Sequence, residues 1–225
     1  PRSTLRHTLF PYTTLSRSGL ITELPKVIGV QCEHADPVFR YYLEQDPGKR
    51  SFEPVNVRAS VAQAAMIGNP VSMPRVIERV RQYDEAAGAR RVFVFQVSEQ
   101  EIMDAMIVAN RNGHVACTQG GESMAGFARA VEEGVVREDE IGILDSTAHM
   151  LKFLGFQELY FEDAFDPAFG VTPRPELKNA PSLVRPAGVQ RFPEPGRPLE
   201  GEDLKRFVRE TALEIAGLLG LERKA

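Results

Sequence analysis

A short run of hydroxyl and imidazole side chains is the part of this sequence best suited to chemistry. Ser146, Thr147 and His149 follow a short apolar stretch and open a predicted helix. The Thr147 hydroxyl could bond the ring nitrogen or phosphate of a ligand, and His149 could act as an acid or base. The same residue types also cap helices or sit satisfied inside a core. Residue types alone leave both interpretations open.

A pair of glycines forms the second candidate. Gly120 and Gly121 precede a predicted helix at 122–133, where backbone N–H groups could receive an anion. Turns need glycine without any ligand, so the pair by itself is a weak signal.

Other reactive side chains have simpler explanations. Cys117 fits a small buried residue, Lys152 a solvated lysine, and Asn69 a turn residue. A solvated helix face is expected to carry the acidic residues Glu99, Glu101 and Asp104.

Alternating strands and helices must position these residues. Apolar runs rich in Val and Ile predict strands at 26–31, 91–97 and 141–144. Helical patterns fall at 36–43, 60–67, 72–80, 98–111, 122–133, from about 150, and at 202–219. Ser98 and Glu101 form a capping box. The order predicts an α/β fold with a largely parallel sheet, in which ligands bind at the carboxyl ends of strands. Segments 118–123 and 145–149 are therefore expected near a site.

The two ends of the chain differ from its middle. Residues 1–18 hold three arginines and no acid, and their stretch TLFPYTTLSRS matches a translated short-read sequencing adapter, with Ser16 in place of Phe. We expect 1–18 to be a non-native, adapter-derived tail, with Gly19 lying inside a longer gene; a natural tail is the alternative. Eight of 16 prolines lie between Pro167 and Pro198. We expect an extended Pro-rich wrap over 166–200 and a terminal helix over 201–225.

Composition excludes several classes of protein. The 225 residues carry a net charge of −4, so nothing favours nucleic acid, and no apolar run is long enough for a membrane helix. Two cysteines without a C-x-x-C motif argue against a disulfide framework or a metal site. A cytoplasmic location is the expectation.

Four blocks of sequence, in order, resemble plant-type threonine synthases. LITELPKVIGVQ with HADPVFRYY is similar to the family's strand and helix, and SVAQAAMIGNPVSMPRVI to its Ala-rich helix and turn. SEQEIMDAM resembles the next acidic helix start, and STAHMLKF the family's STAHGLKF. The resemblance covers Gly19 to about Phe156.

The resemblance implies a fold-type II pyridoxal-phosphate enzyme, similar to the tryptophan synthase β chain. Residues 19–165 would be the C-terminal part of its catalytic domain. The implied reaction converts O-phospho-L-homoserine and water to L-threonine and phosphate, with pyridoxal 5'-phosphate as cofactor and a homodimer as the intact enzyme. Thr147 would face the pyridine nitrogen of the cofactor.

Some positions of this sequence differ from the family's pattern, and one residue that the family needs is absent from it. Met150 replaces a frequent Gly, and the turn 117–123 differs from the plant enzymes. The residues expected to border the active site are Gln119, Gly120, Gly121, Glu122, Ser123, Ala148 and His149. The family's Schiff-base lysine lies upstream of Gly19, so the chain alone is expected to be inactive. The alternatives are a threonine or serine dehydratase and a non-catalytic α/β binding module.

Overall fold

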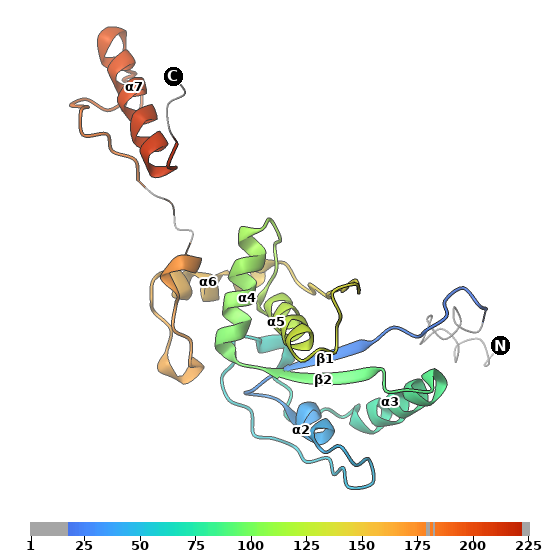
Figure 1. Cartoon of the computed structure of the whole chain (residues 1–225). Helices are drawn as coiled ribbons and strands as arrows, with labels where there is room; N and C mark the ends of the chain where they lie inside the picture. The colour runs from blue at the N-terminus through green and yellow to red at the C-terminus, as the bar shows by residue number, and fades with distance from the viewer. Residues whose placement is uncertain (1–17, 179–180, 182, 222–225) are drawn as a thin grey trace, which may run out of the picture. The chain divides into compact units, whose positions relative to one another are not determined.

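In the computed structural model, residues 18–178, 181 and 183–221 are described, and the chain divides into two compact units, 1–178 and 179–225. Nearly all of the predicted adapter-derived tail lies outside the described residues. In the first unit (Figure 1), the helices and strands are β1 (Val27–Cys32), α2 (Pro37–Leu43), α3 (Met73–Ala87), β2 (Val92–Val97), α4 (Glu99–Arg111), α5 (Thr118–Glu132) and α6 (Leu154–Phe161). Short 3₁₀ helices lie at Gln63–Ala65, Met150–Phe153, Pro167–Phe169 and Pro175–Leu177.

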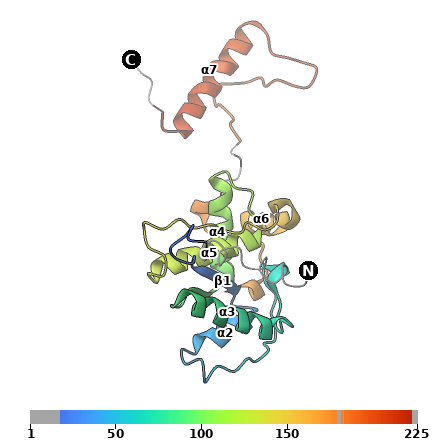
Figure 2. The same ribbon diagram turned by 90° about the vertical axis from the view of Figure 1, so that its right-hand side faces the viewer.

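The sheet of the first unit consists of β1 and β2, which pair in parallel from Val27↔Val92 to Cys32↔Val97. Both strands are rich in β-branched and aromatic residues that suit a pleated, half-buried surface. Helix α5 packs on one face of the sheet with α4 beside it, while α2 and α3 cover the other face (Figures 1 and 2). The α/β class is confirmed, with a smaller sheet than the sequence suggests.

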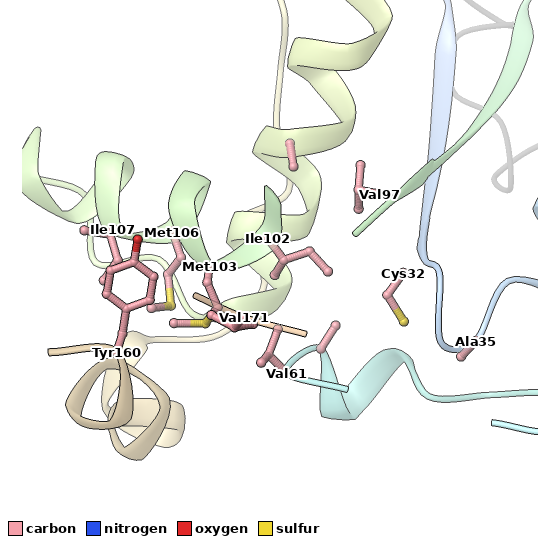
Figure 3. Packing of buried hydrophobic residues seen from close by; sticks show 12 residues of the cluster. Cys32, Ala35, Val61, Val97, Ile102, Met103, Met106, Ile107, Tyr160 and Val171 are labelled. Carbon is pink, nitrogen blue, oxygen red and sulfur yellow. The ribbon is translucent and has the colours of Figure 1, made fainter. Parts of the chain in front are cut away.

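The core lies between α4, α5 and the ends of the strands. Figure 3 shows Ile102, Met103 and Met106 of α4 gathered with Tyr160 of α6, all fully buried. Helix α4 starts at the predicted capping box: the Ser98 Oγ accepts from the N–H of Glu101 at 3.2 Å, and Glu101 Oε2 accepts from the N–H of Ser98 at 2.7 Å. This arrangement holds the start of α4 next to the end of β2.

The predicted strand at 141–144 is wrong. Residues 141–147 carry no regular structure, and Ile141 and Ile143 are each 93% exposed. A strand needs a neighbour to bond its backbone. Within residues 18–178, only β1 and β2 form a ladder of paired strands. The apolar pattern is therefore present without the pairing that would make it a strand.

Two predicted helices differ in extent. At 60–67 only Gln63–Ala65 is helical, because the Ser60 Oγ and the N–H of Val61 bond Glu99, which holds this stretch in an irregular path. The helix predicted at 122–133 begins four residues earlier, at Thr118. Gly120 and Gly121 therefore lie inside α5 rather than in a turn before it.

The second unit contains α7 (Gly201–Leu218), the predicted terminal helix. Segment 183–199 folds back on it, with Phe192 edge-on to Phe207 at 6.1 Å and Arg191 paired with Asp203 at 3.0 Å. Across the described parts of both units, we find no helix with the length and apolar character needed to cross a bilayer.

Candidate functional site

The two segments that the sequence placed near a site lie side by side. The Ser123 Oγ donates to the Asp145 carbonyl at 2.9 Å, and the Cys117 Sγ donates to the Ser146 carbonyl at 3.7 Å. A Cβ on Gly120 would lie 3.1 Å from that same Ser146 carbonyl oxygen. The start of α5 and the segment 145–149 therefore form one continuous edge.

Thr147 has the most unusual backbone of this edge. Its φ is +51°, a left-handed conformation that a β-branched residue rarely adopts. The N–H of Thr147 donates to Asp145 Oδ1 at 2.9 Å, which holds the turn, and the Thr147 side chain is exposed. A strained backbone that presents a hydroxyl to solvent marks Thr147 as a candidate functional residue.

The two glycines serve packing rather than the predicted anion-receiving turn. A Cβ on Gly121 would lie 2.4 Å from the Ile102 carbonyl oxygen of α4, so Gly121 permits the close approach of α4 and α5. Gly120 likewise lets the Ser146 carbonyl oxygen come close to α5. The predicted position in a turn before the helix is wrong: both glycines lie inside α5, where backbone packs against them.

The remaining residues predicted to border the active site differ in how exposed they are and in the hydrogen bonds they already make. The His149 Nδ1 accepts from the N–H of Leu151 at 3.2 Å and so caps the 3₁₀ helix Met150–Phe153. Gln119 is buried; with its amide turned so that the oxygen faces the backbone, it accepts from the N–H groups of Gln63 and Ala64 at 3.2 and 3.1 Å. Ala148 is half-buried. In the segment 145–149, Asp145, Ser146, Thr147 and His149 are exposed, whereas the border residues on α5 are buried or half-buried.

A buried polar cluster lies behind this edge, at the carboxyl ends of β1 and β2. Its members are buried side chains from four separate segments: Cys32, His34, Ser60, Glu99 and Glu122. Glu99 Oε2 accepts from the Ser60 Oγ at 3.0 Å and from the N–H of Val61 at 2.6 Å. Sequence reasoning missed the cluster because its members are far apart along the chain. The capping box, which fixes Glu99 next to the strand end, is the one signal that could have suggested it.

The prediction of a solvated acidic face on α4 is wrong for two of its three members. Glu99 is 0% exposed. Asp104 is largely buried, accepts from the Tyr160 hydroxyl at 2.7 Å and pairs with Arg174 at 2.9 Å. Glu101 is partly exposed and pairs with Arg129. Glu99, the first residue of α4, points inward because Ser98 joins it directly to the end of β2.

Burial perturbs the acidity of this cluster. Burial raises the pKa of Glu122 to about 7, opposed by a bond from the N–H of Cys32 and reinforced by the charge of Glu99. Burial likewise raises the pKa values of Glu99 and of the Cys32 thiol. Carboxyls with raised pKa values at the ends of parallel strands are typical of functional sites.

The other reactive side chains fit the simpler explanations given for them. Cys117 is fully buried and Lys152 is exposed, as predicted. In the part of the chain that the structure describes, no group of three or more His, Cys, Asp or Glu side chains is suited to a metal ion. A pocket of about 570 Å³ lies elsewhere, lined by Phe39, Tyr42, Arg90, Phe93 and Arg129 among others.

Comparison with known proteins finds threonine synthases. The chain is 27% identical over 135 residues to threonine synthase 2, chloroplastic, of Arabidopsis thaliana, and 29% identical over 136 residues to the threonine synthase of Methanocaldococcus jannaschii. It is 28% identical over 142 residues to that of Mycobacterium tuberculosis. No protein-family model matches the chain.

These matches cover 60%, 60% and 63% of this chain. They span only 24%, 31% and 34% of the respective relatives. The chain therefore corresponds to about a third or less of the curated proteins it matches. The resemblance to threonine synthases found in the four sequence blocks is confirmed.

Proposed function

We propose that this chain is the C-terminal part of a pyridoxal-phosphate-dependent threonine synthase, which converts O-phospho-L-homoserine and water to L-threonine and phosphate. The observation that carries the proposal is the edge formed by Thr147 and the start of α5, in a chain similar to threonine synthases from a plant, an archaeon and a bacterium. We further propose a homodimeric, cytoplasmic enzyme.

The residues at this edge fit one part of the cofactor. The exposed Thr147 hydroxyl is neutral and can either donate or accept a hydrogen bond. It would hold the pyridine nitrogen of the cofactor. When bound, pyridoxal phosphate withdraws electrons from the amino-acid substrate, and a neutral partner at its ring nitrogen moderates that withdrawal.

The segment around Thr147 contains no lysine suited to form the Schiff base with the cofactor. Lys152 is the nearest lysine in the sequence, and its side chain is exposed on the 3₁₀ helix Met150–Phe153. A Schiff-base lysine is usually desolvated, which lowers the pKa of its amine and exposes its lone pair. We therefore propose that the lysine and the phosphate-binding loop belong to a segment that precedes Gly19 in the complete gene.

The assay of the complete reading frame tests this function. With O-phospho-L-homoserine and pyridoxal phosphate, we expect equal amounts of threonine and phosphate from the complete protein and neither from the 225-residue chain. Thr147→Ala in the complete protein should lower kcat about tenfold or more, because one hydrogen bond to the ring is lost.

The same assay separates the alternatives. Ammonia and a keto acid as products would identify a dehydratase. Absence of turnover together with ligand binding would favour a binding module. Threonine formation by the 225-residue chain alone would contradict the proposal that the lysine lies upstream.

A further inference from the structure

Five polar side chains from four segments meet in the interior at the carboxyl ends of β1 and β2. Cys32 ends β1, His34 follows it, Ser60 precedes the 3₁₀ helix, Glu99 opens α4 and Glu122 lies in the second turn of α5. Each is at most 5% exposed. Figure 3 shows Cys32 in the same buried cluster as Val61 and Val97, so the polar groups border the apolar core.

Two carboxylate oxygens in this cluster lack hydrogen-bond partners among the described residues. Glu99 Oε2 has two donors, but Glu99 Oε1 has none, and the nearest candidate, His34 Nδ1, is 3.6 Å away. That nitrogen is 2.5 Å from the Ala59 carbonyl oxygen, to which it donates. Glu122 Oε1 is also without a partner. An unpaired buried carboxylate oxygen is costly, so the arrangement calls for a proton.

The charges around the pair lead to the same conclusion. The titratable groups that interact with Glu99 or Glu122 are Glu33, His34 and Cys32, together with each other. His34 alone of these can carry a positive charge, and its Nδ1 is already committed to a carbonyl. A buried carboxylate without a compensating positive charge or hydrogen bonds favours its protonated form.

We propose that the buried Glu122 carboxyl holds a proton in the folded chain, and that this makes Glu122 a positioning residue, which keeps the start of α5 and the attached segment 145–149 in place. Glu122 is flanked by the residues that touch that segment: Gly120 lies against the Ser146 carbonyl, and Ser123 donates to the Asp145 carbonyl. Loss of the proton leaves a buried negative charge on Glu122, whose Oε1 has no hydrogen-bond partner. The start of α5 must then move to let water reach Glu122, and the Thr147 edge moves with it.

This proposal concerns the residues of the chain itself. It is tested without cofactor or substrate, so its failure is distinct from failure of the proposed function. The first measurement is a carboxyl ¹³C NMR titration of the full 225-residue chain, with Glu122→Gln used to assign the resonance. We expect Glu122 to titrate near neutral pH. A midpoint in the ordinary range of an exposed glutamate would overturn the proposal.

The second measurement is hydrogen exchange of amides 118–124 and 145–149 as a function of pH, corrected for intrinsic exchange. In the wild-type chain, protection should fall about tenfold or more as pH rises from 6 to 8.5, since each unit of pKa shift corresponds to a tenfold change. Glu122→Gln keeps the uncharged form, and its protection should stay constant over this range.

The matched control is Glu132→Gln, which removes an exposed carboxylate from the same helix and should follow the wild type. Protection that is independent of pH in the wild type, or a Glu122→Gln chain with the wild-type pH dependence, would overturn the positioning role. If Glu122→Gln does not fold, the wild-type exchange profile and a titration of glutamate resonances assigned through the backbone decide the question.

Discussion

Glu122 shows how a single buried carboxyl ties stability to pH. Its pKa is raised from 4.5 to about 7 by burial, while in the unfolded chain it returns to the ordinary value. The unfolded chain therefore ionises first, and the free energy of unfolding falls as pH rises from about 4.5 to about 7. The loss from this one group should be on the order of 3 kcal/mol, since each pKa unit is worth about 1.4 kcal/mol.

Glu122→Gln should remove that loss. Relative to the wild type, the variant should gain on the order of 3 kcal/mol between pH 4.5 and pH 8. Urea unfolding of both chains at several pH values measures this difference directly. A difference that does not change with pH would show that Glu122 ionises normally, and Glu132→Gln should show no such gain.

The left-handed backbone of Thr147 should lower the free energy of unfolding, a cost that its proposed role in binding the cofactor would explain. Asn tolerates a φ of +51° better than a β-branched residue does, so Thr147→Asn should raise the free energy of unfolding by about 0.5 to 1 kcal/mol. Thr147→Val keeps the branched shape and should give no gain. Thermal unfolding of the two variants compares them, and equal stabilities would mean that the turn stores no strain.

Among single residues, the sequence predicts those candidate site residues that lie close together along the chain. Thr147, His149 and the glycines were identified because they cluster within short motifs. Glu99 was assigned to solvent, although it is buried, because helical spacing alone does not say which way the first turn faces. Glu122 was included only as a border residue by resemblance. The neighbouring Cys32, His34 and Ser60 come from two other segments of the chain, and only folding brings them together.

Among the elements, α5 depends on a close approach to β1. A Cβ on Gly126 would lie 2.2 to 2.9 Å from three atoms of the stiff Val30 side chain. Gly126→Ala should therefore lower the free energy of unfolding by about 1 to 3 kcal/mol, although alanine is the better helix former.

Gly217 of α7 is the matched control, since a Cβ there meets no atom within 4 Å. Gly217→Ala should stabilise α7 by about 0.5 to 1 kcal/mol through helix propensity alone. Urea unfolding and circular dichroism of the two variants give the comparison. Stabilisation by both substitutions would show that α5 does not pack tightly on β1.

Elements with strong local signals were predicted well. Strand β1 is rich in Val and Ile, β2 alternates Val with Phe, and α4 has its capping box and a terminal Asn-Gly. The start of α5 was predicted four residues late because glycines usually end or precede helices, whereas these two are retained for packing against α4 and Ser146. Tertiary contacts override local propensity at such positions.

At the scale of the whole molecule, the exposed apolar stretch at 141–144 favours self-association. Ile141 and Ile143 are each 93% exposed, and the stretch matches a strand that lacks a neighbour. Such segments pair with other chains. The double substitution Ile141→Lys, Ile143→Lys should reduce self-association, measured by sedimentation velocity, and change the free energy of unfolding by less than about 0.5 kcal/mol.

Ile102→Lys provides the contrast, because Ile102 is fully buried and a charge there should prevent folding. Destabilisation of more than about 1 kcal/mol by the double lysine variant would mean that the stretch packs against the rest of the chain. The sequence could predict an apolar strand at 141–144, but it could not predict whether another segment would be present to pair with it.

The parallel pairing of β1 with β2 also has a consequence for biosynthesis. Val27 pairs with Val92, and Cys32 with Val97, so the whole of α2, α3 and their connections must be made between the two strands. During translation β1 emerges first and waits on the ribosome surface with its backbone unpaired. The pairing of β1 with β2 therefore forms only after Val97 has emerged, a non-local step that is slow compared with formation of the helices between the two strands.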